Sequence, residues 1–194
     1  PESEEELEFK RMKERSLVEC SDILDEFRDI FKISVGTEPA EISSLEIKLS
    51  HNFSIPRGLQ APPRRFSFED SDYIAKELER MESLGVITKI DAPMHSQIHL
   101  VSKKDGDKRM CIDFRLLNSI TEPVTWPLPH LQDLLHHLRG KAYFGVLDLS
   151  NGYWQMPVAV ESRRYTTFIS ERGTYALNRV PFGLRNAPSL FQKA

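Results

Sequence analysis

The sequence predicts an α+β fold in which β-hairpins pack against helices. Two observations carry this prediction. Apolar residues recur at helical spacing in separate stretches of the chain, and pairs of strand-like runs are joined by short turns that contain Asp-Gly or Arg-Gly, so neighbouring strands pair locally. The chain has 194 residues, 40% of them hydrophobic and 28% charged, which is ordinary for a globular protein with one sizeable domain, alone or with an extension.

Residues 1–60 are expected to form an acidic, partly helical connector that leads into the main domain at residues 61–194. Residues 4–31 carry an apolar stripe at helical spacing, made of Leu17, Ile23, Leu24, Phe27 and Phe31. The following stretch up to Pro63 is rich in Gly and Pro and reads as irregular. A single strand-like alternation within it comprises Leu45, Ile47 and Leu49.

A second helix is expected between Ser67 and Gly85. Ser67 is a suitable N-cap with Asp70 three residues on, and Gly85 stands where a C′ glycine belongs. The residues that form one apolar face between them are Ile74, Leu78, Met81 and Leu84.

The next segment predicts a hairpin of two runs, Gln97–Ser102 and Arg109–Phe114, around an Asp-Gly turn. Strand parity places Met110, Ile112 and Phe114 on one face, which is expected to pack. Arg109 then projects beside the turn lysines Lys103 and Lys104. Such a cationic fingertip suits a triphosphate, although a solvated charged hairpin explains it as well.

A third helix is expected at Pro127–Arg139, with its leucines inward, followed by a nearly continuous apolar strand at Tyr143–Leu149. Asp148 lies at the end of this strand, before a Ser-Asn-Gly turn. An unpaired charge is costly to bury, and Mg²⁺ prefers hard oxygen ligands, so Asp148 is a candidate metal ligand. The alternative is an aspartate that caps the turn.

The last part of the chain predicts a second hairpin, Tyr165–Ser170 and Thr174–Val180, and then a helix that begins at Asn186 as N-cap, with Pro188 near its first turn. Between them lies a Pro-Phe-Gly loop at residues 181–183. Such a loop can place backbone and an aromatic ring against a flat substrate, although a generic loop explains it about as well.

Composition excludes several classes of protein. Two cysteines, Cys20 and Cys111, give neither a zinc site nor a disulfide framework, and the sequence has no apolar run of membrane-spanning length and no signal peptide. The net charge is −3, whereas a nucleic-acid binder usually has a basic excess. However, residues 1–29 hold most of the acid, and basic pairs such as Arg64–Arg65 and Arg163–Arg164 lie in the later chain.

Three motifs in this order resemble the reverse transcriptases of Ty3/gypsy-like LTR retroelements. They are Lys103-Lys-Asp-Gly with Arg109-Met-Cys-Ile-Asp113-Phe-Arg115-Leu-Leu-Asn118, then Leu147-Asp148-Leu-Ser-Asn-Gly152-Tyr153, then Pro181-Phe-Gly-Leu-Arg-Asn-Ala-Pro188 with Phe191-Gln192. A Pro-Pro-Arg segment at Pro62–Arg64 and the run Phe27–Phe31 are similar to the same family. The resemblance extends over roughly residues 22–194.

The resemblance implies roles for the candidate residues. Asp148 corresponds to the first catalytic aspartate, a ligand of both Mg²⁺ ions, and Tyr153 to the aromatic residue under the incoming sugar that excludes a 2′-hydroxyl. Phe182 corresponds to a residue lining the nucleotide pocket.

The same resemblance assigns the predicted hairpin to the fingers. Lys103 and Arg109 correspond to residues on the nucleotide triphosphate, and Asp113 and Arg115 to a motif around the template. The chain departs from the family at His95–His99, where a Ser-Pro run is usual, which indicates altered template contacts.

The implied fold is the fingers and partial palm of a right-hand polymerase, and the implied activity is that of an RNA-directed DNA polymerase. Its partners would be an RNA or DNA template with primer and dNTP, and its location a cytoplasmic virus-like particle or the nucleus. The family's Tyr-x-Asp-Asp hairpin would lie beyond Ala194, so these residues are expected to be inactive by themselves. The alternative is a non-enzymatic binding protein, co-opted from such an element, with a protein partner.

Overall fold

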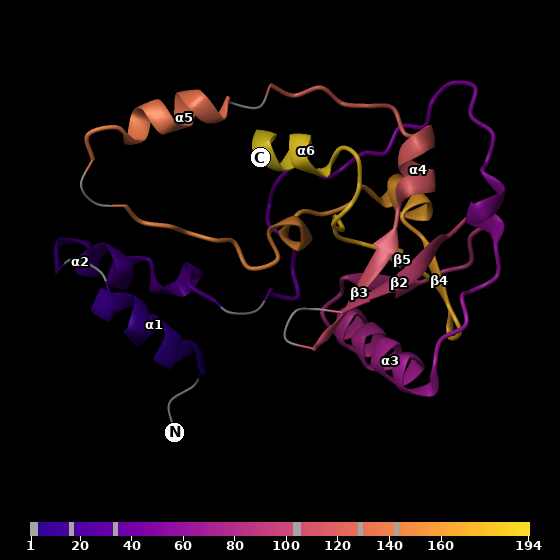
Figure 1. The fold of residues 1–194 in the computed structure, drawn as a ribbon, viewed down its shortest axis with the longest axis horizontal. Helices are drawn as coiled ribbons and strands as arrows, with labels where there is room; N and C mark the ends of the chain where they lie inside the picture. The colour runs from indigo at the N-terminus through magenta and orange to yellow at the C-terminus, as the bar shows by residue number, and fades with distance from the viewer. Residues whose placement is uncertain (1–3, 16–17, 33–34, 103–105, 128–129, 142–143) are drawn as a thin grey trace. The chain divides into compact units, whose positions relative to one another are not determined.

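The computed structural model describes residues 4–15, 18–32, 35–102, 106–127, 130–141 and 144–194 (Figure 1). The chain divides into two compact units. The first comprises Pro1–Val35 and Asp148–Ser150, and the second comprises Gly36–Leu147 and Asn151–Ala194. Residues 36–60, which the sequence assigns to the connector, thus belong to the second unit.

The first unit contains two α-helices, α1 (Glu4–Arg15) and α2 (Val18–Glu26), followed by the short 3-10 helix η1 (Arg28–Ile30). The prediction that residues 4–31 are helical holds for α1 and α2, whereas the end of this segment forms the 3-10 helix η1. Two residues of the predicted apolar stripe, Ile23 and Phe27, are largely exposed. Phe9 is the buried aromatic instead, with the Phe31 ring 5.9 Å away. A highly charged helix offers too little apolar surface to bury a long stripe.

The second unit is built on a five-stranded sheet. Its strands are β1 (Ile87–Lys89), β2 (Ser96–Ser102), β3 (Lys108–Asp113), β4 (Phe168–Ser170) and β5 (Gly173–Leu177), in the order β1-β5-β4-β2-β3. Neighbouring strands pair antiparallel except for β2 and β4, which are parallel. Both predicted hairpins are confirmed, as β2–β3 and β4–β5, so the mixed α+β class is confirmed too.

Helix α3 (Phe68–Ser83) begins where the sequence predicts. The Ser67 hydroxyl accepts a hydrogen bond from the Asp70 backbone N–H at 3.1 Å, which satisfies one of the free amides of the first turn. Gly85 follows the helix with φ +64°, a left-handed conformation that glycine adopts without strain. The residues that α3 buries are Ile74, Ala75, Leu78 and Met81. Three of these four were predicted from their spacing.

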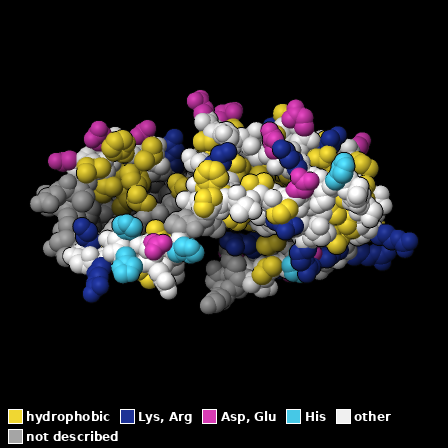
Figure 2. All heavy atoms as spheres, turned by 90° about the horizontal axis from the view of Figure 1, so that it is seen from above, with side chains coloured by type: hydrophobic (Ala, Val, Ile, Leu, Met, Phe, Trp, Pro, Cys, Tyr) yellow, Lys and Arg dark blue, Asp and Glu magenta, His cyan; other side chains and the backbone are white. Residues whose placement is uncertain are grey.

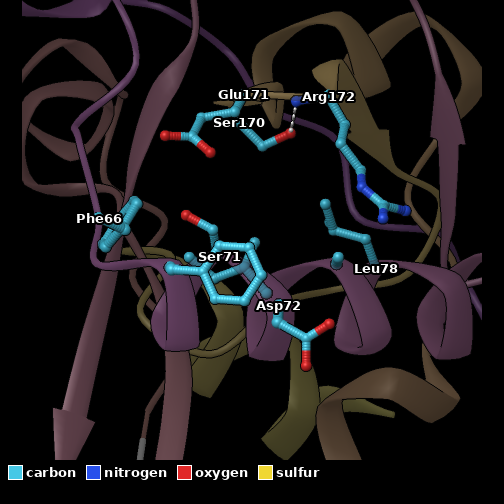
Figure 3. Close-up of a pocket in the computed structure, with 10 residues that line it drawn as sticks. Phe66, Ser71, Asp72, Leu78, Ser170, Glu171 and Arg172 are labelled. Carbon is cyan, nitrogen blue, oxygen red and sulfur yellow. Dashed lines mark hydrogen bonds between the residues drawn. The ribbon is translucent and has the colours of Figure 1, made fainter.

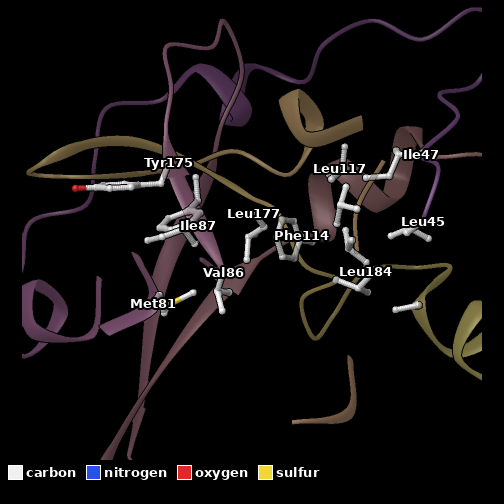
Figure 4. Packing of buried hydrophobic residues seen from close by; sticks show 14 of the residues in the cluster. Leu45, Ile47, Met81, Val86, Ile87, Phe114, Leu117, Tyr175, Leu177 and Leu184 are labelled. Atoms are coloured by element: carbon white, nitrogen blue, oxygen red, sulfur yellow. The ribbon is translucent and has the colours of Figure 1, made fainter. Parts of the chain in front are cut away.

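The core of the second unit lies where α3, the sheet and helix α4 (Arg115–Ile120) meet (Figure 4). Phe114, at the N-cap of α4, is buried together with Val86 and Leu177. Helix α4 was not expected from the sequence, because six residues directly after a strand give a weak helical period.

The connector reaches this core through the predicted alternation. Leu45 and Ile47 are buried, as a strand with one inward face would have them. The prediction of a strand is wrong nonetheless, since the segment makes only isolated bridges, Leu45 with Val158 and Leu49 with Thr121. The alternation therefore correctly indicated which side chains are buried, but the segment does not pair with a neighbour as a strand.

Two further expectations are wrong. Helix α5 (Leu131–Leu138) forms, but Leu134, Leu135 and Leu138 are about half exposed rather than inward. Residues 144–149 form no strand, and Val146 is 92% exposed, while Tyr143 lies outside the described residues. A strand with apolar residues on both faces needs neighbours, and none of the described strands pairs with this segment. Hydrophobic side chains are accordingly visible at the surface in Figure 2.

Helix α6 (Ala187–Lys193) follows the Pro-Phe-Gly loop, and two 3-10 helices lie between α5 and β4: η3 (Gly152–Gln155) and η4 (Val160–Tyr165). A fourth 3-10 helix, η2 (Arg57–Gln60), precedes α3. Within the described ranges, no helix combines the length and the apolar character needed to cross a membrane.

Candidate nucleotide site

The centre of the candidate site is a cluster of three aromatic rings. Tyr153, on η3, has its ring centroid 5.0 Å from that of Phe182 and 5.3 Å from that of Phe191. The interplanar angles are 69° and 79°, so both contacts are edge to face, a favourable arrangement for aromatic pairs. The structure therefore brings together two of the predicted site residues, Tyr153 and Phe182, and adds Phe191.

This aromatic cluster is partly exposed to solvent. Phe182 is 56% exposed although it is a large apolar side chain, and Phe191 is also exposed. Tyr153 is half-buried, so its ring has support from the protein beneath it. A partly exposed, supported aromatic surface suits a flat ligand such as a sugar or a base.

The loop that carries Phe182 is fixed by Asn118. The Asn118 side chain donates from Nδ2 to the Gly183 carbonyl at 2.7 Å and accepts at Oδ1 from the Arg185 backbone N–H at 2.9 Å. Gly183 has φ +90°, a conformation that side-chain-bearing residues rarely adopt. The Pro-Phe-Gly loop is therefore held in one shape, and Asn118 is a site residue whose role sequence reasoning missed.

Asn186 also ties this loop to the chain after α4. Its side chain donates from Nδ2 to the Glu122 carbonyl at 2.8 Å and accepts from the Val124 N–H at 3.0 Å. Asn186 stands at the N-cap position of α6, as predicted, but makes no side-chain cap hydrogen bond. The Asn186 amide does not cap the helix because it is already bonded to Glu122 and Val124.

Asp148 is exposed and belongs to the first compact unit, whereas Tyr153 belongs to the second. No group of three or more His, Cys, Asp or Glu residues that could hold a metal ion occurs among the residues whose structure is described. Two-metal nucleotidyl transfer needs several carboxylates to hold two ions. The donor set around Asp148 therefore does not fit two Mg²⁺ ions on its own.

The predicted fingertip is described only in part, because Lys103 and Lys104 lie outside the described residues. Arg109 is exposed on β3, opposite Val101. Its neighbour Lys108 is engaged elsewhere: its Nζ lies 2.9 Å from a carboxylate oxygen of Glu69 and 2.9 Å from one of Asp70. These two hydrogen bonds raise the pKa of Lys108, Asp70 contributing more. Lys108 thus anchors the hairpin to the start of α3.

Asp113 and Arg115, the predicted template residues, bind each other. The Arg115 guanidinium donates to both carboxylate oxygens of Asp113, at 2.8 and 2.6 Å. This bidentate contact lowers the pKa of Asp113 to about 2. Asp113 also lines a cavity of about 270 Å³ together with Arg64 and Gln97, whereas the Arg115 side chain is exposed.

A second cavity, of about 240 Å³, lies between α3 and the turn of the β4–β5 hairpin (Figure 3). Its walls include Phe66 and Leu78, and Arg172 stands at the hairpin side with its backbone N–H bonded to Ser170 Oγ at 3.1 Å. It shares no residue with the aromatic cluster.

The chain is similar to reverse transcriptases and to Pol polyproteins of transposons. Residues 101–194 match the family model described as "Reverse transcriptase (RNA-dependent DNA polymerase)". The Pol polyprotein from transposon gypsy of Drosophila melanogaster is 38% identical over 130 residues, 64% of this chain and 13% of that protein. The corresponding polyprotein from transposon opus is 35% identical over 125 residues, 62% of this chain and 12% of its own length.

A plant virus protein is similar over more of the chain. The enzymatic polyprotein of Cauliflower mosaic virus (strain Strasbourg) is 29% identical over 193 residues, 96% of this chain and 28% of that protein. The chain thus spans little more than a quarter of this relative's length, and less of the transposon polyproteins.

Solved structures share the fold. A protease–reverse transcriptase of prototype foamy virus aligns with a TM-score of 0.78 at 21% identity, covering 95% of this chain and 25% of that one. A foamy viral protease–reverse transcriptase in complex with double-stranded DNA aligns with a TM-score of 0.76 at 20% identity, covering 98% and 34%. These alignments confirm the predicted α+β fold of a right-hand polymerase.

Proposed function

The chain belongs to the reverse transcriptases of Ty3/gypsy-like elements, and from this premise we propose that its Tyr153–Phe182 surface binds the sugar of the incoming nucleotide during RNA-directed DNA synthesis. The observation that carries the proposal is the aromatic cluster itself. Tyr153 is supported by Phe182 and Phe191, and both phenylalanine side chains are partly exposed. A rigid ring in van der Waals contact with the sugar leaves no room for a 2′-hydroxyl.

The phosphates of the nucleotide are assigned to the fingertip. Arg109 is exposed near the end of β3, and a guanidinium binds phosphate oxygens with two parallel hydrogen bonds. Lys103 is the second proposed phosphate ligand. Because Lys108 already forms ion pairs with Glu69 and Asp70, its proposed role is to position the hairpin and not to bind the triphosphate.

The proposed reaction is nucleotidyl transfer. The primer 3′-hydroxyl oxygen forms a bond to the α-phosphorus and gives up its proton to water. The bond from that phosphorus to the bridging oxygen breaks, and pyrophosphate leaves with both bonding electrons. The family implies a divalent metal cofactor, and we propose Mg²⁺ with Asp148 as one ligand. A lone carboxylate is expected to hold Mg²⁺ weakly, because this ion dehydrates reluctantly.

The template with its primer is the proposed macromolecular partner, and Asp113 and Arg115 are proposed to lie along its path. Arg115 is suited to this role, since its side chain is largely exposed although it pairs with Asp113. A virus-like particle in the cytoplasm, or the nucleus, is the proposed location.

The test uses a polymerase that contains these residues together with the family's Tyr-x-Asp-Asp hairpin. Asp148→Asn keeps the shape of the side chain and removes its charge, so we expect primer extension to disappear while binding of a primer–template duplex is unchanged. Fluorescence anisotropy of a labelled duplex measures the binding. Asp133→Asn, on the exposed α5, is the matched control and leaves both unchanged. Full extension by Asp148→Asn would refute the assignment. If the parent enzyme binds the duplex but does not extend the primer, the alternative of a co-opted, non-enzymatic binding protein is favoured.

A further inference from the structure

Arg179 is a fully buried arginine, only 1% exposed, two residues after the end of β5. Burial lowers the pKa of its guanidinium, and the negative charge of Glu38 opposes this shift. Taking a guanidinium out of water is costly unless its N–H groups are satisfied. Two of them reach backbone carbonyls: Nη1 donates to Trp154 at 3.2 Å, and Nη2 donates to Thr37.

The two carbonyls belong to segments that are far apart in sequence. Trp154 directly follows Tyr153 within η3, and Thr37 lies at the start of the second compact unit. A further bond joins the same segments, from the Ala40 N–H to the Gln155 carbonyl at 2.7 Å. One charged side chain therefore links the connector to the turn that carries Tyr153.

The other side of this turn is attached to the backbone around Arg179. The Val180 N–H donates to the Met156 carbonyl at 2.9 Å, and the Met156 N–H donates to the Tyr153 carbonyl at 3.0 Å. Arg179 thus adds a charged side-chain link to the backbone hydrogen bonds that support this turn. The ring of Tyr153 stands on this support and contacts Phe182.

We propose that Arg179 is a positioning residue that holds the Tyr153 ring at the height needed to distinguish deoxyribose from ribose. This inference rests on the proposed function of Tyr153. A ring that discriminates by steric exclusion must be held to within about 0.5 Å, because a larger displacement admits the extra oxygen. Without Arg179, the Trp154 carbonyl loses its buried donor and the turn can relax away from the sugar.

Asn178 provides a matched control. It precedes Arg179 in the chain and also makes two side-chain hydrogen bonds that join distant segments, to Thr88 Oγ1 at 2.7 Å and to the Gly85 carbonyl at 3.1 Å. Its side chain bonds neither to η3 nor to the connector. Asn178→Ala should therefore lower the stability of the protein without changing the position of the Tyr153 ring.

The experiment measures kcat/KM for single dNTP and rNTP additions, together with the melting temperature, in a polymerase that contains these residues. The variants are Arg179→Met, Arg179→Lys, Asn178→Ala and Tyr153→Ala. We expect Arg179→Met to reduce the preference for dNTP about tenfold or more, in the direction of Tyr153→Ala. Arg179→Lys keeps a single donor nitrogen, so its preference for dNTP should lie between those of Arg179→Met and the parent. Asn178→Ala should lower the melting temperature and leave the preference unchanged.

Three outcomes overturn the proposal. If both Arg179 variants keep the parental preference while Tyr153→Ala loses it, Arg179 is merely structural and the proposed role of Tyr153 survives. If Tyr153→Ala itself keeps the preference, the proposed function fails and this inference fails with it. If Asn178→Ala relaxes the preference as much as Arg179→Met, the effect comes from general destabilisation. Should Arg179→Met fail to fold, Arg179→Lys decides between these outcomes.

Discussion

The ring of Tyr153 meets the ring of Phe182 edge to face, with 5.0 Å between their centroids and 69° between their planes. The two residues come from different segments, and each is fixed by a polar side chain bonded to nearby backbone. Asn118 holds the loop of Phe182, and Arg179 holds the turn of Tyr153. The geometry of the candidate site therefore depends on these side-chain hydrogen bonds as much as on aromatic contact.

Asn118→Ala is expected to lower the free energy of unfolding by about 1–3 kcal/mol, because it removes two hydrogen bonds, to the Gly183 carbonyl and from the Arg185 N–H, each of which contributes about 0.5–1.5 kcal/mol. Urea denaturation measures the loss. The adjacent Ser119→Ala, which removes only an exposed bond to the Leu116 carbonyl, is the control and should cost much less. Equal losses in the two variants would show that Asn118 does not hold the loop.

Gly183→Ala tests the backbone of the same loop. An added Cβ would lie 3.9 Å from the Phe114 ring, an ordinary contact, so the cost comes from the φ of +90° alone. We expect a destabilisation of roughly 1–3 kcal/mol, typical of a residue forced into such a conformation. Gly145→Ala is the comparison, since it lacks a positive φ and its Cβ would meet no atom within 4 Å. A Gly183→Ala protein as stable as Gly145→Ala would mean that the loop adopts another conformation.

The Asp113–Arg115 pair predicts a pH dependence of stability. The pKa of Asp113 falls from 3.8 to about 2 in the folded chain, so the native state binds this proton less tightly than the unfolded state does. Its stabilising contribution is thus complete above a pH of about 3.8 and is lost as the pH falls through about 2.

The comparison is between the parent chain and Asp113→Asn, with unfolding midpoints measured from pH 6 downward. The parent should be slightly more stable at pH 6, by the small amount usual for an exposed ion pair, and the difference should shrink below a pH of about 3.8. A difference that grows as the pH falls would contradict the assigned direction of the shift.

Residues 1–194 alone are expected to give no primer extension with Mg²⁺ or Mn²⁺. Two ions held about 3.5–4 Å apart need several carboxylates, and the described residues offer no group of three that could hold a metal ion. The assay extends a labelled primer on an RNA template and on a DNA template, with a complete reverse transcriptase as positive control. Robust extension by the purified chain would disprove the requirement for further carboxylates.

Features with local signals were predictable from the sequence. Ser67 and Gly85 mark the ends of α3 through capping chemistry, and the turn glycines mark both hairpins, because each of these signals lies within a few residues. The contact of Asn118 with Gly183 spans 65 residues and has no periodic signature. The resemblance assigned Tyr153 to the incoming sugar and Phe182 to the nucleotide pocket. The structure shows their rings in contact, and both roles stay predictions.

Apolar pattern alone misled where burial depends on distant partners. The run at residues 144–149 has the composition of a buried strand, yet the described strands give it no neighbour and Val146 is exposed. On α5, Leu134, Leu135 and Leu138 have helical spacing, but about half of each of these side chains remains exposed. Periodicity indicates which residues share one face of a helix or strand. That face is buried only if another helix or strand packs against it.

The most direct test of the proposed nucleotide site is the sugar selectivity of Tyr153→Ala in a polymerase that contains these residues. The ratio of kcat/KM for dNTP to that for the matching rNTP is measured beside the melting temperature, with Tyr165→Ala, whose ring does not belong to the aromatic cluster, as control. We predict that Tyr153→Ala keeps part of its activity and incorporates ribonucleotides more readily, while the control keeps the parental ratio. An unchanged ratio in a folded, active Tyr153→Ala enzyme would contradict the assignment of this residue to the sugar.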